Sequence, residues 1–213
     1  MDEEIEIINT NTRIEKFKNF IISKRKQIIK LLLIIILILI SFFGFQEFNS
    51  RNKVKLANKF NEIATNFDNG QKNVKNDLVE IINIKDKTYS PLAFFFLLDN
   101  DLIKSKDEIN SYFNVLINEI PLDKEIKNLT IYKKGLYNSD FVEENELLNI
   151  LNPIIKSESM WKPQAIYLMA EYYLAKNQKQ KSKDFFEQVI LIENISPKIK
   201  LEVQKRLRSE FSD

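Results

Sequence analysis

Cysteine and histidine are both missing from the 213 residues, and glycine occurs only three times. Without cysteine the chain has no disulfides, thiolate nucleophiles, zinc knuckles or iron–sulfur clusters. Without histidine, Ser-His-Asp and Cys-His catalysis and every histidine-ligated metal site are excluded. The sequence contains neither a GxxxxGKS/T loop nor a GxGxxG turn for phosphate binding. The composition therefore argues against an enzyme, and we expect no cofactor, no metal and no small-molecule substrate.

A strong charge of one sign is also missing, because 32 Lys and Arg residues face 30 Asp and Glu residues, for a formal net charge of +2. Nucleic-acid binding depends on a clustered excess of positive charge, so we expect no nucleic-acid partner. If the protein were an enzyme, its mechanism would have to use carboxylates as the only catalytic groups, as in glycoside hydrolysis by two acids. Asp99 and Asp101 are such a pair in sequence, but residues two apart on a helix point to different sides.

What the sequence does contain is one long apolar run, LLLIIILILISFFGF, at residues 31–45. With the two isoleucines before it and a snorkelling Lys30, it spans about 27 Å as a helix, close to the thickness of a bilayer core. A buried core helix is one alternative, but no face of the run is polar. A cleaved signal peptide is another, but no A-x-A-like site follows the run. We therefore predict a transmembrane helix at 27–48 that contacts the lipid bilayer through residues 28–45.

Basic residues are denser before this run than after it, and the positive-inside rule then places the N-terminus in the cytoplasm. The residues that set this orientation are Lys24, Arg25, Lys26 and Lys30. We predict a cytoplasmic tail at 1–26 and a domain outside the membrane at 49–213, in the periplasm of a Gram-negative cell. The tail either extends the membrane helix or lies as an amphipathic helix on an anionic membrane surface.

From residue 49 onward the apolar residues follow helical periodicity, and a motif of paired apolar residues recurs. Its four copies are Leu78–Ile82, Tyr112–Ile117, Leu147–Leu151 and Phe185–Ile190. They start about 34 to 38 residues apart, a period typical of helix–turn–helix repeats of the tetratricopeptide type. An irregular helical bundle with accidental spacing is the alternative. The first and third units are degenerate, and in the second, Asp101 stands where Tyr173 stands in the fourth.

The last unit has the clearest repeat pattern. Its first helix is expected at 162–173, and its second follows a turn at Asn177 and Gln178. The apolar and small positions of these helices are Ile166, Met169, Ala170, Tyr173, Ser182, Phe186 and Val189. Ser196 and Pro197 then start a capping helix with Ile199, Val203 and Leu207. We predict an all-α fold, with a tetratricopeptide-like superhelix of about four helix pairs plus a C-terminal capping helix.

A short tail, one span and an outer array of degenerate repeats resemble the YfgM-like family of ancillary Sec translocon subunits in proteobacterial inner membranes. The resemblance covers nearly the whole chain and is sharpest at 161–193, in the phrase AIYLMA at 165–170. It implies an inner-membrane scaffold that contacts translocon subunits and periplasmic chaperones and has no catalytic residues. An assembly factor for cell-envelope or outer-membrane proteins, built on the same repeats, is the alternative function.

Helix-repeat arrays bind partners along the face formed by their first helices. In the last unit the residues expected on that face are Gln164, Tyr167 and Glu171, and in the second unit they are Leu92, Phe95 and Asp99. An aromatic ring beside an amide and a carboxylate suits a peptide ligand, because the ring supplies area and the polar groups orient the backbone. The alternative is that the three successive phenylalanines at 94–96 belong to the core.

Overall fold

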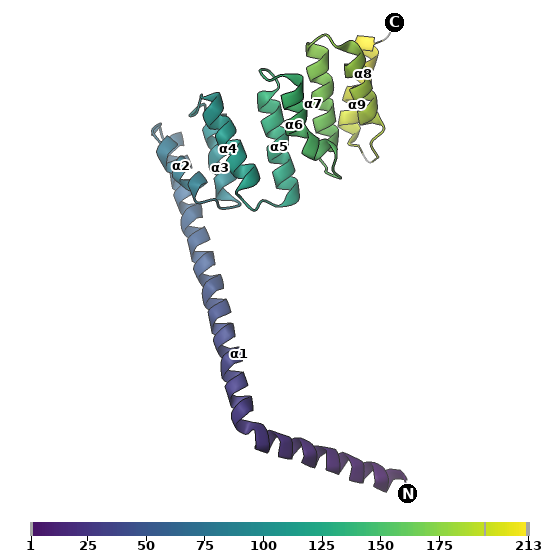
Figure 1. Ribbon diagram of the computed structural model, residues 1–213. Helices are drawn as coiled ribbons and strands as arrows, with labels where there is room; N and C mark the ends of the chain where they lie inside the picture. Colours follow the sequence, from purple (N-terminus) through teal and green to yellow (C-terminus); the bar gives the residue numbers. More distant parts are fainter. Residues whose placement is uncertain (1, 194, 212–213) are drawn as a thin grey trace. The chain divides into compact units, whose positions relative to one another are not determined.

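The computed structural model describes residues 2–193 and 195–211, with side chains at 16, 18–27 and all described positions from 29 onward. The helices are α1 (Asp2–Asp68), α2 (Lys75–Asn83), α3 (Tyr89–Asp99), α4 (Lys106–Asn118), α5 (Lys124–Asn138), α6 (Glu144–Ile155), α7 (Lys162–Ala175), α8 (Lys179–Ile190) and α9 (Pro197–Phe211) (Figure 1). No described residue lies in a β-strand. The expected all-α class is therefore confirmed for this part of the chain.

The chain divides into two units, Met1–Asn58 and Lys59–Asp213. In the first unit, α1 carries the one described segment, beginning at Ile29, that is long and apolar enough to cross a membrane. The four successive side chains at 37–40 are each 49% to 63% exposed. At 100° per residue these four residues cover the whole circumference of the helix. The apolar run is therefore not a core helix of the described structure.

The helix α1 runs without interruption past both ends of the span predicted at 27–48. Residues 46–58 contain neither proline nor glycine, so nothing in the sequence stops the helix after the apolar run. The second unit begins at Lys59, inside α1.

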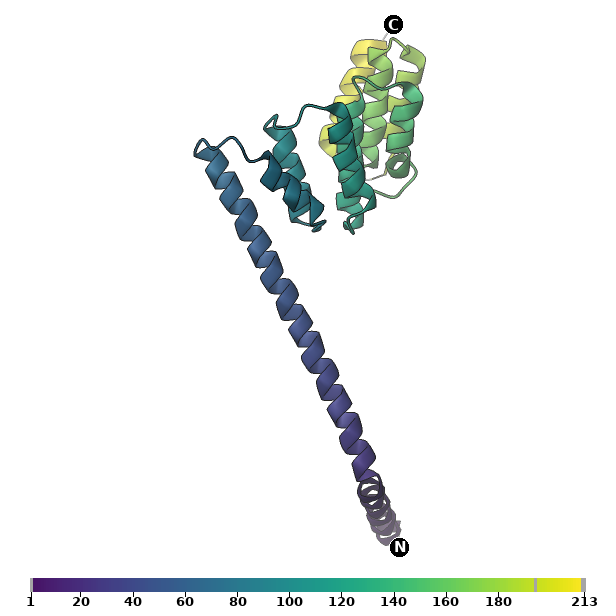
Figure 2. The same cartoon turned by 60° about the vertical axis from the view of Figure 1, so that its left-hand side comes forward.

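Within the second unit, each helix from α2 to α9 packs against the next one in sequence, and α7 also contacts α5 and α9 (Figure 2). The four paired-apolar motifs lie in α2, α4, α6 and α8. The last turns of α1 pack against α3, where the Phe67 and Phe96 rings are 5.3 Å apart. The helices α2 to α9 are thus packed in sequence order within the second unit.

The third pair forms a regular contact although its sequence pattern is weak. A Cβ on Gly135 in α5 would lie only 2.5 Å from Cδ2 of Leu151 in α6, a fully buried side chain. Gly135 stands about one repeat length before Ala170, the small residue of the fourth unit. A missing side chain at this position lets α5 and α6 approach closely.

The fourth pair and the final helix share one core. Its buried residues are Ile166, Ala170, Phe186, Val189 and Val203. The Ser182 hydroxyl donates a hydrogen bond to the Ala170 carbonyl at 2.9 Å, so two small residues meet where α7 and α8 cross. The expected positions of both helices and of the final helix are confirmed.

The helices α3 and α7 end in the same way, and this corrects the expected alignment of the second unit. In each, the chain reverses through a residue with positive φ, Asp101 at 54° and Asn177 at 58°. The next amide donates back to the last turn, from Leu102 to Leu97 and from Gln178 to Tyr173, both at 2.9 Å. This is the Schellman arrangement. Asp101 therefore corresponds to Asn177 and not to Tyr173, because α3 ends about one turn earlier.

Candidate protein-binding surfaces

The predicted groove residues lie on two surfaces of the second unit. Phe95 and Asp99 are on α3, whereas Gln164, Tyr167 and Glu171 are on α7. The residues expected to set membrane orientation are in the other unit, exposed along α1. The surface on α3 and the surface on α7 differ in which side chains cover them.

An apolar cavity of about 320 Å³, which we call the α3–α5 cavity, lies between the beginnings of α3 and α5. Leu92 and Phe95 of α3 face Ile126 of α5 across it. Leu92 and Ile126 are each 45% exposed. Lys87 and Asp123, whose charged groups are 4.0 Å apart, stand at its rim. An apolar floor with a charged rim suits an apolar side chain presented by a protein partner.

Phe95 is held firmly in this cavity. Its ring packs against Phe94 at 5.2 Å and Phe113 at 6.3 Å between centroids. The Lys133 ammonium lies 4.3 Å from the centre of the Phe95 ring, within cation–π range. Phe94 is fully buried while Phe95 and Phe96 are half-buried, so the three aromatic residues divide between core and surface.

The carboxylate of Asp99 does not line the α3–α5 cavity. Asp99 is the last residue of α3 and is exposed. Asp101 lies beyond the helix end, in the left-handed turn described above. The two acids therefore occupy different types of backbone structure, and the structure provides no paired acid site at 99 and 101.

Tyr167 and Glu171 face the final helix of the chain. Arg206 of α9 forms an ion pair with Glu171, with Nε 2.8 Å from Oε1, and it donates a hydrogen bond from Nη2 to Oε2 at 3.0 Å. The Tyr167 ring packs on Phe186 at 5.5 Å, and burial together with the hydrogen bond to Glu171 raises the pKa of Tyr167 to about 12. Arg206 thus holds the carboxylate through one charge-assisted hydrogen bond and a close ion-pair contact. These two predicted groove residues are thus engaged within the protein itself.

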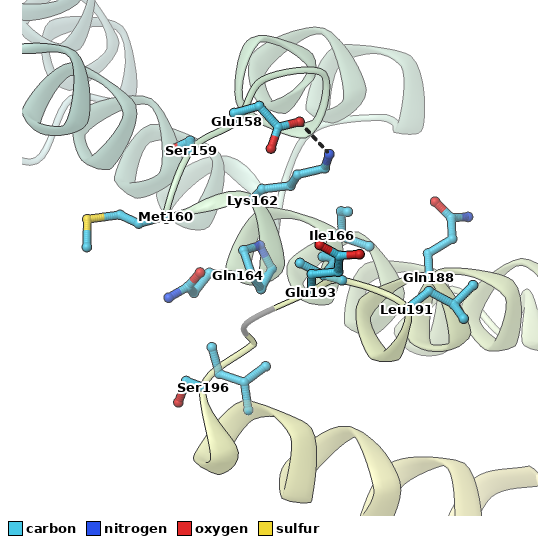
Figure 3. Close-up of a pocket in the computed structure, with 13 residues that line it drawn as sticks. Glu158, Ser159, Met160, Lys162, Gln164, Ile166, Gln188, Leu191, Glu193 and Ser196 are labelled. Carbon is cyan, nitrogen blue, oxygen red and sulfur yellow. Dashed lines mark ion pairs between the residues drawn. The ribbon is translucent and has the colours of Figure 1, made fainter.

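Gln164 lies elsewhere, in a cavity of about 850 Å³ between the first turn of α7, the end of α8 and the start of α9. Figure 3 shows Met160 on one side of this cavity and Leu191 on the other. Both are largely exposed, at 67% and 80%. The Gln164 Oε1 atom is buried and has no hydrogen-bond partner among the described residues. Lys162 and Glu158 form an ion pair of 4.0 Å beside it.

Three apolar surface residues, Ile126, Met160 and Leu191, did not follow from the sequence. Ile126 could have been predicted from the repeat, because it stands about one repeat length after Leu92 and so occupies the equivalent position. Met160 and Leu191 lie in connections between helices, where no periodicity marks them.

A metal-binding cluster is absent from the described part of the chain, where no group of three or more acidic, histidine or cysteine residues converges.

No family model, curated protein or solved structure matches this chain. Function must therefore be argued from the exposed surfaces and from the apolar helix.

Proposed function

We propose that this protein is a membrane-anchored scaffold that binds other proteins through its helix pairs and catalyses no reaction. One observation carries the proposal. The same chain contains a helical segment that is apolar on every side and a second unit of packed helices with apolar side chains exposed at its surface. The α3–α5 cavity is the proposed contact. Its apolar lining and rim charges resemble the centre and edge of a protein interface.

The apolar run of α1 is the proposed anchor. Each Leu, Ile or Phe near the centre of a bilayer favours insertion by about 0.3–0.6 kcal/mol, so the run contributes several kcal/mol in total. The dense basic residues at 24–26 and Lys30 favour a cytoplasmic N-terminus. The helix pairs then lie in the periplasm of a Gram-negative cell, where the tether raises their effective concentration near membrane partners.

We further infer that the helix pairs wind as a tetratricopeptide-like superhelix. The recurrence of the apolar motifs supports this inference, as do the contacts of α7 with α5 and α9, which join the first helices of successive units. Small residues at the helix crossings, Gly135 and Ala170, also fit such repeats.

Translocon subunits and periplasmic chaperones of the inner membrane are the proposed partners, in keeping with the resemblance to the YfgM-like family. We would test the contact with the double variant Leu92→Lys/Ile126→Lys, purified with its crosslinked partners from solubilised membranes. The control is Leu136→Lys, which puts one lysine on an exposed leucine of α5 outside the cavity. A lysine in an apolar contact is costly, so we expect at least tenfold less partner with the double variant.

Equal recovery by the double variant and the control would contradict the contact. Recovery of outer-membrane assembly proteins in place of Sec components would favour the alternative function. Glycan turnover by the purified full chain would contradict a scaffold without catalysis.

The membrane topology has its own test. A reporter fused after Asp213 is expected to be active outside the cytoplasm, and activity only in the cytoplasm would overturn the predicted orientation.

A further inference from the structure

A third cavity, of about 560 Å³, lies between α4, α5 and α6 and is lined by side-chain amides. Its amides come from Asn110, Asn114 and Asn118 of α4 and Asn149 of α6. We call it the asparagine groove. It differs from the α3–α5 cavity, because Ile131 of α5 lines the groove and lies about 140° around the helix from Ile126.

The inner end of this groove is fixed by polar contacts. Asn110 and Asn138 exchange two amide hydrogen bonds, of 3.1 Å and 2.9 Å, and Asn138 is buried. Lys134 donates from Nζ to Asn114 Oδ1 at 2.8 Å. Within the described residues, no hydrogen bond uses Asn114 Nδ2 or the side-chain amides of Asn118 and Asn149. The outer amides are therefore open to a ligand.

The charges around the groove favour a neutral ligand. Lys134 is its one lining cation, and Asp107 and Glu146 are its two lining acids. Among the described residues, no carboxylate lies within ion-pair distance of Lys134. Burial lowers the pKa of Lys134, while the charge of Glu146 partly opposes that shift. Such a mixed surface has no excess positive charge for nucleic acid, whereas it accepts a polar, uncharged group.

We propose that the asparagine groove binds an extended peptide segment through its backbone. Asn114 and Asn118 are four residues apart, so their amides lie about 6 Å apart along α4, whereas the amide of Asn110 is already bonded to Asn138 and the Lys106 carbonyl. In an extended peptide, residues that face the same side repeat about every 6.6 Å. Asn114 offers its Nδ2 donor, and Asn118 offers both a donor and an acceptor, which match a peptide C=O and N–H. The apolar lining from Ile117 and Ile150 then contacts alternate side chains.

This site goes beyond the proposed function, because it lies on a different face and does not require the α3–α5 cavity to bind anything. Its test uses the full chain in lipid nanodiscs and a fluorescein-labelled heptapeptide of alternating threonine and valine with both ends blocked. The double variant Asn114→Ala/Asn118→Ala removes two exposed amides. Asn145→Ala, on an exposed position of α6 outside the groove, is the matched control.

We expect measurable binding by fluorescence anisotropy, a dissociation constant about tenfold higher for the double variant, and a change below twofold for Asn145→Ala. A depsipeptide with esters in place of three N–H groups should lose about as much affinity for the unaltered protein. This second measurement does not depend on how the variant folds. Equal binding by the double variant, equal binding of the depsipeptide, or no binding at all would overturn the proposal. Loss of binding only in Leu92→Lys/Ile126→Lys would do the same.

Discussion

At the scale of single residues, the sharpest packing constraint is the contact between Gly135 and Leu151. We predict that Gly135→Ala lowers the free energy of unfolding, because the new Cβ would lie 2.5 Å from a fully buried leucine. Overpacking of this kind costs about 1–3 kcal/mol, partly offset by about 1 kcal/mol from the better helix propensity of alanine. Chemical denaturation of the full chain, followed by circular dichroism, measures the change.

The control is a double-mutant cycle with Leu151→Ala. With the leucine truncated, Gly135→Ala should become neutral or stabilising, which gives a coupling energy of about 1–3 kcal/mol between the two positions. Additive effects would mean that the two residues do not constrain each other.

Glu144 leads to a prediction about pH. Its carboxylate accepts hydrogen bonds from Lys181 Nζ and the Tyr173 hydroxyl, both at 2.9 Å, and these lower the pKa of Glu144 below 4.5. Because the folded pKa lies below the unfolded one, this stabilisation is present above pH 4.5 and is lost as pH falls through the folded pKa. We expect Glu144→Gln to be less stable than the unaltered protein at pH 7. Below pH 4.5 the gap should close in denaturation experiments; a gap that is constant with pH would contradict the contact.

Residues inside the last repeat were predictable because their spacing encodes their burial. Ile166, Ala170 and Phe186 followed from helical periodicity alone and are buried as expected. The pairing of Glu171 with Arg206 did not follow, because no local pattern identifies two charged side chains that meet across two helices. Gln164, Tyr167 and Glu171 were therefore expected on one face, whereas tertiary packing directs Gln164 and the other two to different neighbours.

At the scale of helices, α9 closes the core of the fourth pair. We predict that Val203→Ala lowers the free energy of unfolding by about 2 kcal/mol, because Val203 is fully buried against α7 and α8. Leu201→Ala on the same helix is the control, since Leu201 is 55% exposed and should change stability by less than about 0.5 kcal/mol. Equal effects in thermal denaturation would mean that α9 does not cap this core.

Helix positions were predictable to within a few residues where periodicity was strong. The first helix of the last unit was expected at 162–173 and is Lys162–Ala175. The third pair was expected to be degenerate, and yet α5 and α6 pack regularly, because glycine replaces the usual small side chain at their crossing. The end of the predicted span at residue 48 has no counterpart in helix structure, since a bilayer boundary need not interrupt a helix.

At the scale of the whole molecule, the apolar run of α1 is the proposed membrane anchor. We predict that Ile34→Asp/Leu37→Asp releases the protein from membranes in a carbonate-extraction experiment. Two acids near the bilayer centre cost about 5–7 kcal/mol, which is similar to the total gain from the run. Val54→Asp, an exposed position of α1 after the run, is the control and should stay in the membrane fraction. Extraction of the unaltered protein by carbonate would contradict the proposed anchor.

Photocrosslinking in intact cells most directly tests the proposal that this protein binds other proteins. A benzophenone amino acid at position 126, in the α3–α5 cavity, is compared with the same residue at position 136 on the same helix. We predict a discrete protein adduct, in the membrane fraction, at position 126 and not at 136. No adduct at 126 beyond that at 136 would contradict the proposal that this cavity binds a partner protein.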